Sequence, residues 1–431
     1  MTLFHSEGTL CDPDGELFIK PCTQQEIEFY ETAFKDHGAF AELMPRYYGT
    51  LSLNNVTDVD DINEQLPVVA DHMSLEMKEE AVRMAMEATA EAAAEAAAEA
   101  AAEAKAPQDK DNIRWRPNKN RKIATNKSVV LKNAAYGFKR PNILDAKLGK
   151  RLWADDAPLE KRKRFDEISK ATTNGSHGFR IAGMRVYKGG DDPAEWDEEG
   201  YKVYGKDYGR LDVNSDNLVS EMKKFIFNPQ AGIDEDLGKA IAGAFADDLK
   251  RVEKVLAGEE SRMYSASLLF TFEGDGDALR RAIEYTMPSS TSSQDAEQPV
   301  PVSVSKPKMG DVPGLIASRV DSAIVLDDDG EMVMRPADAE HQNGKAVNHE
   351  AILSVVQEHI NLESVDGDID IEDLEMEDDD FDDDENSSMP RIYSLKLIDF
   401  AHASWVPGQG PDENNLFGVR SLVKIFEELS A

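Results

Sequence analysis

Apolar and polar residues alternate in the first part of the chain with the period of short β-strands. The alternation predicts strands at residues 9–11 and 16–20, and the Asp-Pro-Asp-Gly sequence between them predicts a tight turn. From residue 24 to 34 the apolar period becomes helical, with Ile27 and Tyr30 on one stripe. We expect these elements to begin a small α+β lobe.

Similar periodicity returns in later regions of the chain, where it predicts further strands and helices. The strands are expected at residues 128–131, 178–187, 265–274 and 391–400. The helices are expected at residues 158–170, 215–227, 234–257 and 412–429. The mixture is typical of an α+β protein.

Two long stretches lack this periodicity and are predicted to be insertions. Residues 54–112 carry glutamates at four-residue spacing in an alanine background. Such a composition favours a helix but offers no larger apolar stripe for docking, so we expect a solvated helical spacer. Residues 288–390 are rich in polar residues and end in the acidic run 363–385, which holds 15 Asp or Glu and no Lys or Arg. We expect this second stretch to be disordered.

Composition narrows the class of protein. The 431 residues carry a net charge of −36, and the two cysteines, Cys11 and Cys22, exclude a disulfide scaffold. The sequence contains no run of 18 apolar residues and begins without the pattern of a signal peptide. We therefore expect a soluble protein of the nucleus and cytoplasm, without a stable membrane anchor.

A cationic segment interrupts this acidic chain. Residues 110–164 hold 17 Lys or Arg against 5 Asp or Glu, a local net charge of +12, which indicates an anionic ligand. Within it lie Asp145 and Lys147, which share a face if their stretch is extended. Such a pair orients a hydroxyl and neutralises a phosphate, although a solvated ion pair is the commoner alternative. Lys161 and Arg164 follow in a basic helix that could be a phosphate-binding wall, a solvated face or a nuclear localisation patch.

Two further positions suggest phosphoryl transfer. Lys20, on a strand, precedes Glu26 on the next helix, an order similar to the lysine–glutamate ion pair of protein kinases, although two exposed charges are an equal alternative. Asp399 ends a predicted strand in the sequence Ile-Asp-Phe, and an aspartate at such a position binds the Mg²⁺ of kinase sites.

In combination, these motifs resemble the inositol polyphosphate kinase family in order and spacing. The resemblance covers residues 5–50, 128–286 and 391–431, and within the family it is greatest to fungal inositol polyphosphate multikinases. The matching motifs are Pro141-x-x-x-Asp145-x-Lys147-x-Gly149, Gly178-Phe179-Arg180, Ser267-Leu268-Leu269-Phe270 and Ile398-Asp399-Phe400-Ala401-His402.

The resemblance implies an α+β, two-lobed kinase-like fold, related to protein kinases and ATP-grasp proteins and carrying two low-complexity insertions. The two lobes and the two insertions are expected to occupy six segments of the chain. They are residues 1–53 (first part of the N-lobe), 54–112 (Ala/Glu-rich helical insertion), 113–140 (second part of the N-lobe and hinge), 141–287 (C-lobe with the inositol-binding segment), 288–390 (disordered acidic insertion) and 391–431 (end of the C-lobe, with the metal-binding strand and terminal helix).

The resemblance also implies an activity, ATP-dependent phosphorylation of soluble inositol polyphosphates, with ATP and Mg²⁺ as cofactors. Asp145 would orient the attacking hydroxyl, Lys147 would bind a phosphate and Asp399 would hold Mg²⁺. The implied nucleotide contacts are Lys20, its partner Glu26, and the backbone of the hinge residues Leu131, Lys132, Asn133 and Ala134. The implied substrate contacts are Lys161, Arg164, Arg185 and His402. Because Lys132 and Asn133 replace carboxylates usual in the family, a ribose contact does not carry over, whereas adenine recognition by main-chain atoms does.

Other functions remain open at this stage. An inositol hexakisphosphate kinase and an inositol trisphosphate 3-kinase are the enzyme alternatives. A nuclear scaffold that binds basic or transcription-related proteins through residues 363–385 is the non-enzymatic one. Direct nucleic-acid binding is not expected, because the chain is anionic overall and its basic segment suits a polyphosphate. We expect a monomer.

Overall fold

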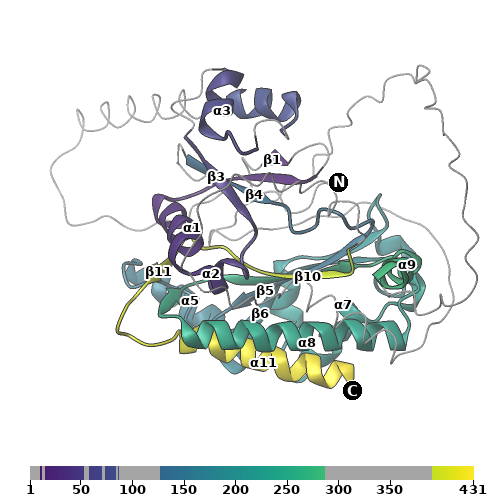
Figure 1. Ribbon diagram of the computed structural model, residues 1–431. Helices are drawn as coiled ribbons and strands as arrows, with labels where there is room; N and C mark the ends of the chain where they lie inside the picture. The colour runs from purple at the N-terminus through teal and green to yellow at the C-terminus, as the bar shows by residue number, and fades with distance from the viewer. Residues whose placement is uncertain are drawn as a thin grey trace, which may run out of the picture.

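Two β-sheets divide the described part of the chain into two lobes (Figure 1). The computed structural model describes residues 10–11, 15–52, 58–69, 73–83, 86, 127–286 and 391–431. The central part of the predicted helical spacer and the acidic insertion both lie outside these residues. The fold is therefore α+β and two-lobed, as predicted.

The N-lobe contains a four-stranded antiparallel sheet in the order β1-β2-β4-β3. Its strands are β1 (Leu10–Cys11), β2 (Leu17–Pro21), β3 (Tyr47–Ser52) and β4 (Lys127–Lys132). Helices α1 (Gln24–Asp36) and α2 (Gly38–Ala41) follow β2. The side chain of Thr23 caps α1 by accepting a hydrogen bond from the backbone of Glu26.

Strand β3 was absent from the sequence prediction, which found no periodicity beyond residue 49. The register of β3 against β4 shifts between Tyr47 and Gly49, and Gly49 has a φ of +141°. A bulge at a glycine breaks the alternation of exposed and buried positions, so the strand leaves no clear pattern in the sequence.

The beginning of the predicted insertion packs on the N-lobe sheet. Helix α3 (Val59–Gln65) starts at Asp58, whose side chain forms a capping box with Asp61. Its Ile62 and the later Met73 and Met77 belong to one buried cluster with Leu17, Ile19, Leu51 and Val130. The described part of residues 54–112 therefore adds a layer to the N-lobe core, whereas the sequence prediction treated the whole range as a spacer.

The C-lobe is built on a five-stranded antiparallel sheet in the order β10-β9-β5-β6-β7. The strands are β5 (Pro141–Leu148), β6 (Phe179–Tyr187), β7 (Tyr201–Tyr204), β9 (Ser267–Glu273) and β10 (Tyr393–Ile398). The short strands β8 (Ser261–Met263) and β11 (Ala403–Trp405) pair separately. The helices are α5 (Leu159–Ala171), α6 (Thr173–His177), α7 (Leu218–Ile226), α8 (Glu235–Gly258), α9 (Gly276–Thr286) and α11 (Glu413–Ser430).

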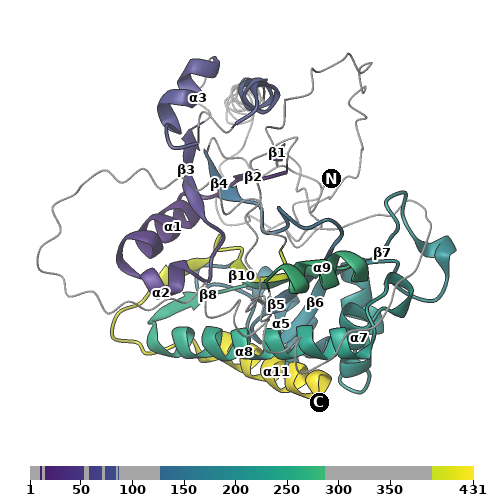
Figure 2. The same cartoon turned by 45° about the vertical axis from the view of Figure 1, so that its right-hand side comes forward.

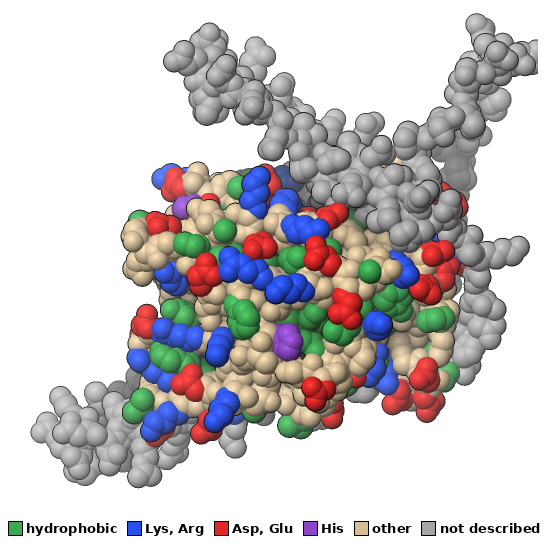
Figure 3. All heavy atoms as spheres, turned by 90° about the horizontal axis from the view of Figure 1, so that it is seen from below, with side chains coloured by type: hydrophobic (Ala, Val, Ile, Leu, Met, Phe, Trp, Pro, Cys, Tyr) green, Lys and Arg blue, Asp and Glu red, His purple; other side chains and the backbone are tan. Residues whose placement is uncertain are grey.

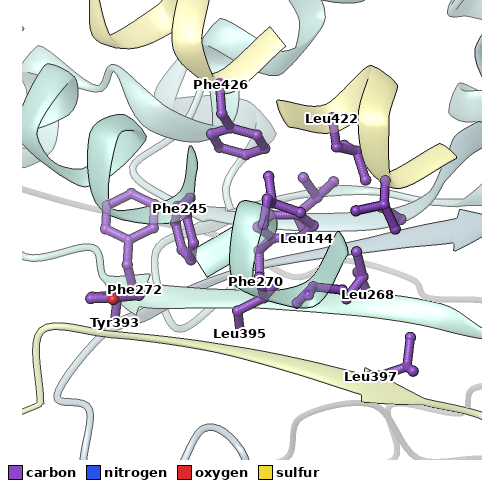
Figure 4. Close-up of a cluster of buried hydrophobic side chains, with 14 of the residues drawn as sticks. Leu144, Phe245, Leu268, Phe270, Phe272, Tyr393, Leu395, Leu397, Leu422 and Phe426 are labelled. Atoms are coloured by element: carbon purple, nitrogen blue, oxygen red, sulfur yellow. The ribbon is translucent and has the colours of Figure 1, made fainter. Parts of the chain in front are cut away.

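Helices α8 and α11 lie side by side beneath the C-lobe sheet (Figures 1 and 2). Phe426 of α11 stacks on Phe270 of β9 at 5.0 Å between ring centroids, and Phe245 of α8 packs edge-on against the same ring (Figure 4). Each fully buried ring of this kind contributes about 1.5–3 kcal/mol through removal of apolar surface from water. The dense core holds the sheet rigid under the site described below.

The opposite side of the α8–α11 pair is charged. Acidic and basic side chains are intermixed on the face seen from below (Figure 3). The ion pairs Arg420–Glu253 and Lys250–Glu427, at 2.7 and 3.2 Å, join the two helices. None of the helices in the described ranges is long and apolar enough to cross a membrane.

Aromatic packing connects the two lobes at one end of the cleft. Phe29 of α1 stacks on Phe400, just after β10, and on Trp405 of β11, with centroid distances of 5.0 and 4.7 Å. Each ring closely follows a residue of the predicted site: Phe29 follows Glu26, Phe400 follows Asp399, and Trp405 follows His402. This contact therefore sets the position of Lys20 on β2 relative to Asp399 after β10.

Candidate active site

A lysine and two carboxylates from three elements meet at the junction of the lobes. Nζ of Lys20 lies 2.9 Å from Oε1 of Glu26 and 2.8 Å from Oδ1 of Asp399. Glu26 is 1% exposed, so its charge requires a close partner. The predicted Lys20–Glu26 pair is present in the structure, and Asp399 joins it from the other lobe.

The charge of Lys20 is maintained by these carboxylates. Burial acts to lower the pKa of Lys20, but the nearby charges of Asp399 and Glu26 outweigh it and hold the pKa well above its usual value. A permanent ammonium at this position is suited to binding the oxygens of a nucleotide phosphate.

Alternate residues of β5 face the cleft. Leu144, Ala146 and Leu148 point into the core under the sheet, whereas Ile143 belongs to a separate apolar cluster on the other face. Asp145 and Lys147 share the face of Ile143 because side chains alternate along a strand. The predicted extended conformation of this stretch, with its acid and base on one side, is confirmed.

Lys147 is held by two groups of the C-lobe. Its Nζ atom donates a hydrogen bond to the carbonyl of Ser265 at 2.9 Å and lies 3.8 Å from Oδ2 of Asp399. The side chain is buried, with 6% of its surface exposed. Asp399 therefore sits between Lys20 and Lys147, one cation on each of its oxygens.

Asp145 has an environment that suits proton transfer. Burial raises its pKa to about 6, and the charge of Lys147 opposes that rise while the charge of Asp399 adds to it. Its Oδ1 atom is buried and has no hydrogen-bond partner of good geometry among the described residues. A carboxylate with this pKa accepts a proton from an alcohol more readily than an ordinary aspartate.

The carboxylate of Asp399, directly after β10, is suited to hold a divalent cation. Mg²⁺ binds hard oxygen ligands and needs only one or two carboxylates when phosphate oxygens complete its shell. Among the residues that the structure describes, no group of three or more His, Cys, Asp or Glu could hold a metal without such help.

Beside this cluster lies a cavity with mainly apolar walls. It extends from Lys20, Asp145 and Asp399 to the connection between the lobes. Its apolar lining comes from both sheets and consists of Phe18, Tyr30, Pro45, Leu131, Ala134, Ala135, Ile143, Leu269 and Ile398. The predicted hinge residues Leu131, Lys132, Asn133 and Ala134 all line it. A flat aromatic ring with polar edges suits this shape, as at other mainly apolar ligand sites.

The Asn133 side chain is already engaged in holding the hinge. Its amide nitrogen donates to the carbonyl of Gly15 at 2.7 Å, and its amide oxygen accepts from the backbone of Ala135 at 3.0 Å. This arrangement connects the hinge to the turn before β2.

A basic wall, made of Lys161 and His402, adjoins Lys147. The pKa of His402 is lowered by burial and further by the charges of Lys161 and Lys147. These three residues are therefore near one another, as predicted for the substrate side. Lys161 and Arg164 lie in the first turns of α5 and are partly exposed.

The structure does not bring Arg185 to this wall. Its guanidinium stacks on the ring of Tyr201 at 3.7 Å and forms ion pairs with Asp197, at 3.1 Å, and with Glu199. The Nη2 atom faces both carboxylates and the plane of the guanidinium stacks on the ring, while Nη1 is buried without a hydrogen-bond partner among the described residues. These contacts indicate a structural role for Arg185, and the expected contact with the pocket is not among them.

Arg180 is the cation of β6 that lies near Asp145. It is paired with Lys147 across the strands, is fully buried, and its charge lowers the pKa of Asp145. Its Nη1 atom donates to Oδ1 of Asn174 at 2.9 Å, and the amide of Asn174 in turn donates to the carbonyls of Lys147 and Gly149. The sequence contained Arg180 in a matching motif, but only the strand register shows its position.

A separate hollow of about 700 Å³ opens beyond Gly149. It is lined by residues of the loop after β5, of α5 and α6, and by Ser215 and Asn414. None of the predicted site residues lines it. The chemistry of the site therefore belongs to the smaller cavity between the lobes.

Comparison with known proteins identifies related sequences. The family model described as inositol polyphosphate kinase matches residues 128–427. The inositol polyphosphate multikinase of Saccharomyces cerevisiae is 30% identical over 291 residues, which cover 62% of this chain and 70% of that protein. The multikinase of Schizosaccharomyces pombe is 27% identical over 266 residues, covering 61% of this chain and 74% of that protein.

Solved structures were compared as well. The crystal structure of S. cerevisiae inositol phosphate multikinase Ipk2 in complex with ADP and Mn²⁺ aligns with a TM-score of 0.49 at 23% identity, covering 96% of this chain and 99% of that chain. The TM-score is below 0.5, so the family membership rests on the sequence match over residues 128–427.

Proposed function

Because this chain belongs to the inositol polyphosphate kinase family, we propose that it transfers the terminal phosphoryl group of ATP to hydroxyls of soluble inositol polyphosphates. Inositol trisphosphate and its tetrakisphosphate product are the proposed substrates. The observation that supports the proposal is that Asp145 lines the apolar cavity and lies near Lys147, which adjoins the basic wall of Lys161 and His402.

The nucleotide would occupy the apolar cavity, with its base against the hinge residues Leu131, Lys132, Asn133 and Ala134. Its phosphates would then extend toward Lys20, whose position is maintained by Glu26. Mg²⁺, when bound, would neutralise charge on these phosphates, and Asp399 would hold it. One end of the cavity would thus bind the triphosphate and the other end the purine.

The inositol ring would bind on the other side of Asp145. Its phosphates would contact Lys147, Lys161 and Arg164, with His402 beside them. Positioning and charge neutralisation supply most of the rate enhancement in phosphoryl transfer. The cations of this wall have both effects on a substrate that carries several negative charges.

Chemically, the ring hydroxyl oxygen forms a bond to the γ-phosphorus as the bond from that phosphorus to the β,γ-bridging oxygen breaks. The hydroxyl proton passes to the carboxylate of Asp145, and ADP leaves with the electron pair of the broken bond. Lys147 and Lys20 face the oxygens on which negative charge accumulates. This division gives Asp145 and Lys147 separate tasks on one strand face.

The proposal is tested by offering inositol tris-, tetrakis- and hexakisphosphate separately with ATP and Mg²⁺, and separating the products by anion-exchange chromatography. We expect the tris- and tetrakisphosphate to gain phosphate and the hexakisphosphate to remain unchanged. Conversion of the hexakisphosphate alone would replace the proposal with a hexakisphosphate kinase. We further propose that the protein works as a monomer in nucleus and cytoplasm, which fluorescent tagging and sedimentation would check.

A further inference from the structure

The hollow of about 700 Å³ beyond Gly149 has no part in the proposed reaction. We call it the α5–α6 hollow, because residues of these two helices line it together with the loop after β5. Its volume lies within the range of about 300–1,000 Å³ that is typical of small-molecule sites. The hollow is therefore large enough to hold a substituted six-membered ring.

The lining of the α5–α6 hollow carries an excess of positive charge. Lys150, Arg151 and Lys170 are its cations, and Asp166 is its carboxylate. One oxygen of Asp166 accepts a hydrogen bond from the indole nitrogen of Trp153 at 2.7 Å, so it is already engaged within the lining. A hollow with this balance of charge favours an anionic ligand.

All three cations can reach a ligand. Lys150 and Lys170 are exposed, and neither ammonium group forms an ion pair or hydrogen bond with any residue that the structure describes. The guanidinium of Arg151 is fixed by stacking on the ring of Trp153 at 3.8 Å. Its carboxylate partner, Asp155, has a side chain that is 83% exposed, so water and salt screen that pair. A fixed guanidinium beside two unpaired ammonium groups suits a ligand that carries several phosphates.

Neutral polar side chains supply a second kind of contact in the α5–α6 hollow. The hydroxyl of Ser215 donates a hydrogen bond to the hydroxyl of Ser176 at 2.9 Å, and Asn214 lines the hollow beside them. Hydroxyl and amide groups both donate and accept hydrogen bonds, which matches the hydroxyls of a polyol. The combination of cations with these groups indicates a phosphorylated polyol.

Hydrogen bonds connect the hollow to the end of the catalytic strand. Oδ1 of Asn414 accepts from the backbone nitrogens of Lys150 and Arg151, at 2.9 and 2.8 Å. The hydroxyl of Ser169 donates to the carbonyl of Lys150 at 2.5 Å. Both Asn414 and Ser169 line the hollow. Lys150 follows Lys147 by three residues, which span at most about 11 Å. A ligand bound to Lys150 and Arg151 would therefore act on the segment that directly follows β5.

We propose that the α5–α6 hollow is a second ligand site, which binds a compact polyol carrying several phosphates. The phosphates contact Lys150, Arg151 and Lys170, and the free hydroxyls contact Ser176 and Ser215. A soluble polyol phosphate and the head group of a phosphorylated lipid both offer this chemistry. That the product of the reaction binds there and changes turnover through the loop after β5 rests on the proposed function, whereas the binding itself does not.

The test is hydrogen–deuterium exchange of the full chain, titrated with inositol hexakisphosphate in the absence of ATP. The peptide that covers residues 211–217 contains Asn214 and Ser215 but none of the proposed active-site residues, so it reports on the hollow alone. We expect the probe to slow its exchange. Lys150→Ala/Lys170→Ala should raise the half-saturating probe concentration at least tenfold, whereas Lys254→Ala on the exposed surface of α8 should leave it unchanged. If the double variant does not fold, Lys170→Gln alone should raise that concentration at least threefold.

Vesicles distinguish the two sources of the ligand. They contain phosphatidylcholine and phosphatidylinositol bisphosphate at a ratio of about nine to one. Co-sedimentation of the full chain that Lys150→Ala/Lys170→Ala abolishes would assign the lipid head group, and slowed exchange with the soluble probe alone would assign the free polyol phosphate.

Two results would overturn the second site. One is exchange in residues 211–217 that the probe does not change, together with no co-sedimentation. The other is a response that Lys150→Ala/Lys170→Ala retains in full. Turnover of inositol trisphosphate by the same preparations tests the proposed function separately. Turnover without any response of residues 211–217 or of the vesicles would remove the second site only, and a response without turnover would remove the enzymatic proposal only.

Discussion

Nζ of Lys20 lies 2.8 Å from Oδ1 of Asp399, although the two residues are 379 positions apart in the sequence. Lys20 belongs to β2 of the N-lobe, and Asp399 follows β10 of the C-lobe. The stacking of Phe29 on Phe400 brings the two segments together. The proposed phosphate-binding lysine and the proposed metal-binding aspartate therefore lie in direct contact.

Asp399 is best removed by substitution to asparagine. Its backbone is left-handed, with a φ of +67°, a conformation that asparagine accepts more readily than alanine. Asp399→Asn should lower kcat by about 10²–10³-fold through loss of a charge at the reacting phosphate. Circular dichroism and thermal unfolding should remain close to those of the unaltered protein. Turnover retained at the original rate would remove Asp399 from the site.

The pKa of Asp145 predicts how activity depends on pH. Because its pKa is raised to about 6, the carboxylate is largely protonated at lower pH and accepts no proton. We expect kcat/KM to fall about tenfold for each pH unit below about 6. A pH–rate profile measured with saturating ATP checks this. Activity that stays constant down to pH 4 would contradict the role of Asp145.

The same shift predicts an effect on stability. In the unfolded chain Asp145 returns to a pKa of about 4, so between about pH 4 and 6 the folded state holds an extra proton and the free energy of unfolding falls as pH rises. Asp145→Asn should therefore raise the free energy of unfolding by about 1–3 kcal/mol at pH 7 and abolish turnover. Urea unfolding at pH 4 and pH 7 checks the sign. The gain should disappear at the lower pH.

Lys20→Met tests the buried ion pair. The substitution leaves Glu26, which is 1% exposed, without its partner, and should cost about 3 kcal/mol of stability. In the double variant Lys20→Met/Glu26→Gln the uncompensated charge is gone, so most of that stability should return while turnover remains absent. Urea unfolding and turnover assays of both variants separate the two effects. A double variant as unstable as the single one would show that the pair is not the cause.

Lys161 and Arg185 form a matched comparison between a substrate contact and a structural cation. Lys161→Ala should raise KM for inositol trisphosphate about tenfold by removing an ion pair to a phosphate, with KM for ATP unchanged. It should also raise the pKa of His402, which NMR titration would detect, because Lys161 contributes to lowering it. Arg185→Ala should instead lower the melting temperature, because it leaves Asp197 buried without its partner. The reverse pattern would exchange the two roles.

The sequence predicted the elements whose periodicity is regular. Helix α1 and strands β2 and β9 lie within a few residues of their expected bounds, because each has one apolar face against a core. Strand β3 was missed because Gly49 introduces a bulge. The first half of the insertion was taken for a spacer because its apolar residues, such as Ile62 and Met73, are widely spaced and only meet on the sheet.

The site shows a similar division. The alternation along β5 already placed Asp145 and Lys147 on one face, and the order of motifs indicated Lys20, Glu26 and Asp399. The sequence could not tell which of Arg180 and Arg185 lies near Asp145, because both lie on β6. Only the pairing with β5, which sets Arg180 opposite Lys147 and Arg185 opposite Ile143, separates them. Arg185 meets the carboxylates of Asp197 and Glu199, which come from a loop without periodicity.

The central claim is that Asp145 directs a hydroxyl of an inositol polyphosphate at ATP. It is tested most directly by incubating the full chain with inositol trisphosphate, ATP and Mg²⁺, and comparing the phosphate gained by the ring with the ADP released. We predict one phosphate on the ring for every ADP, with tetrakisphosphate appearing before pentakisphosphate and neither formed by Asp145→Asn. Release of ADP without phosphorylation of the ring, or equal turnover by folded Asp145→Asn, would contradict the claim.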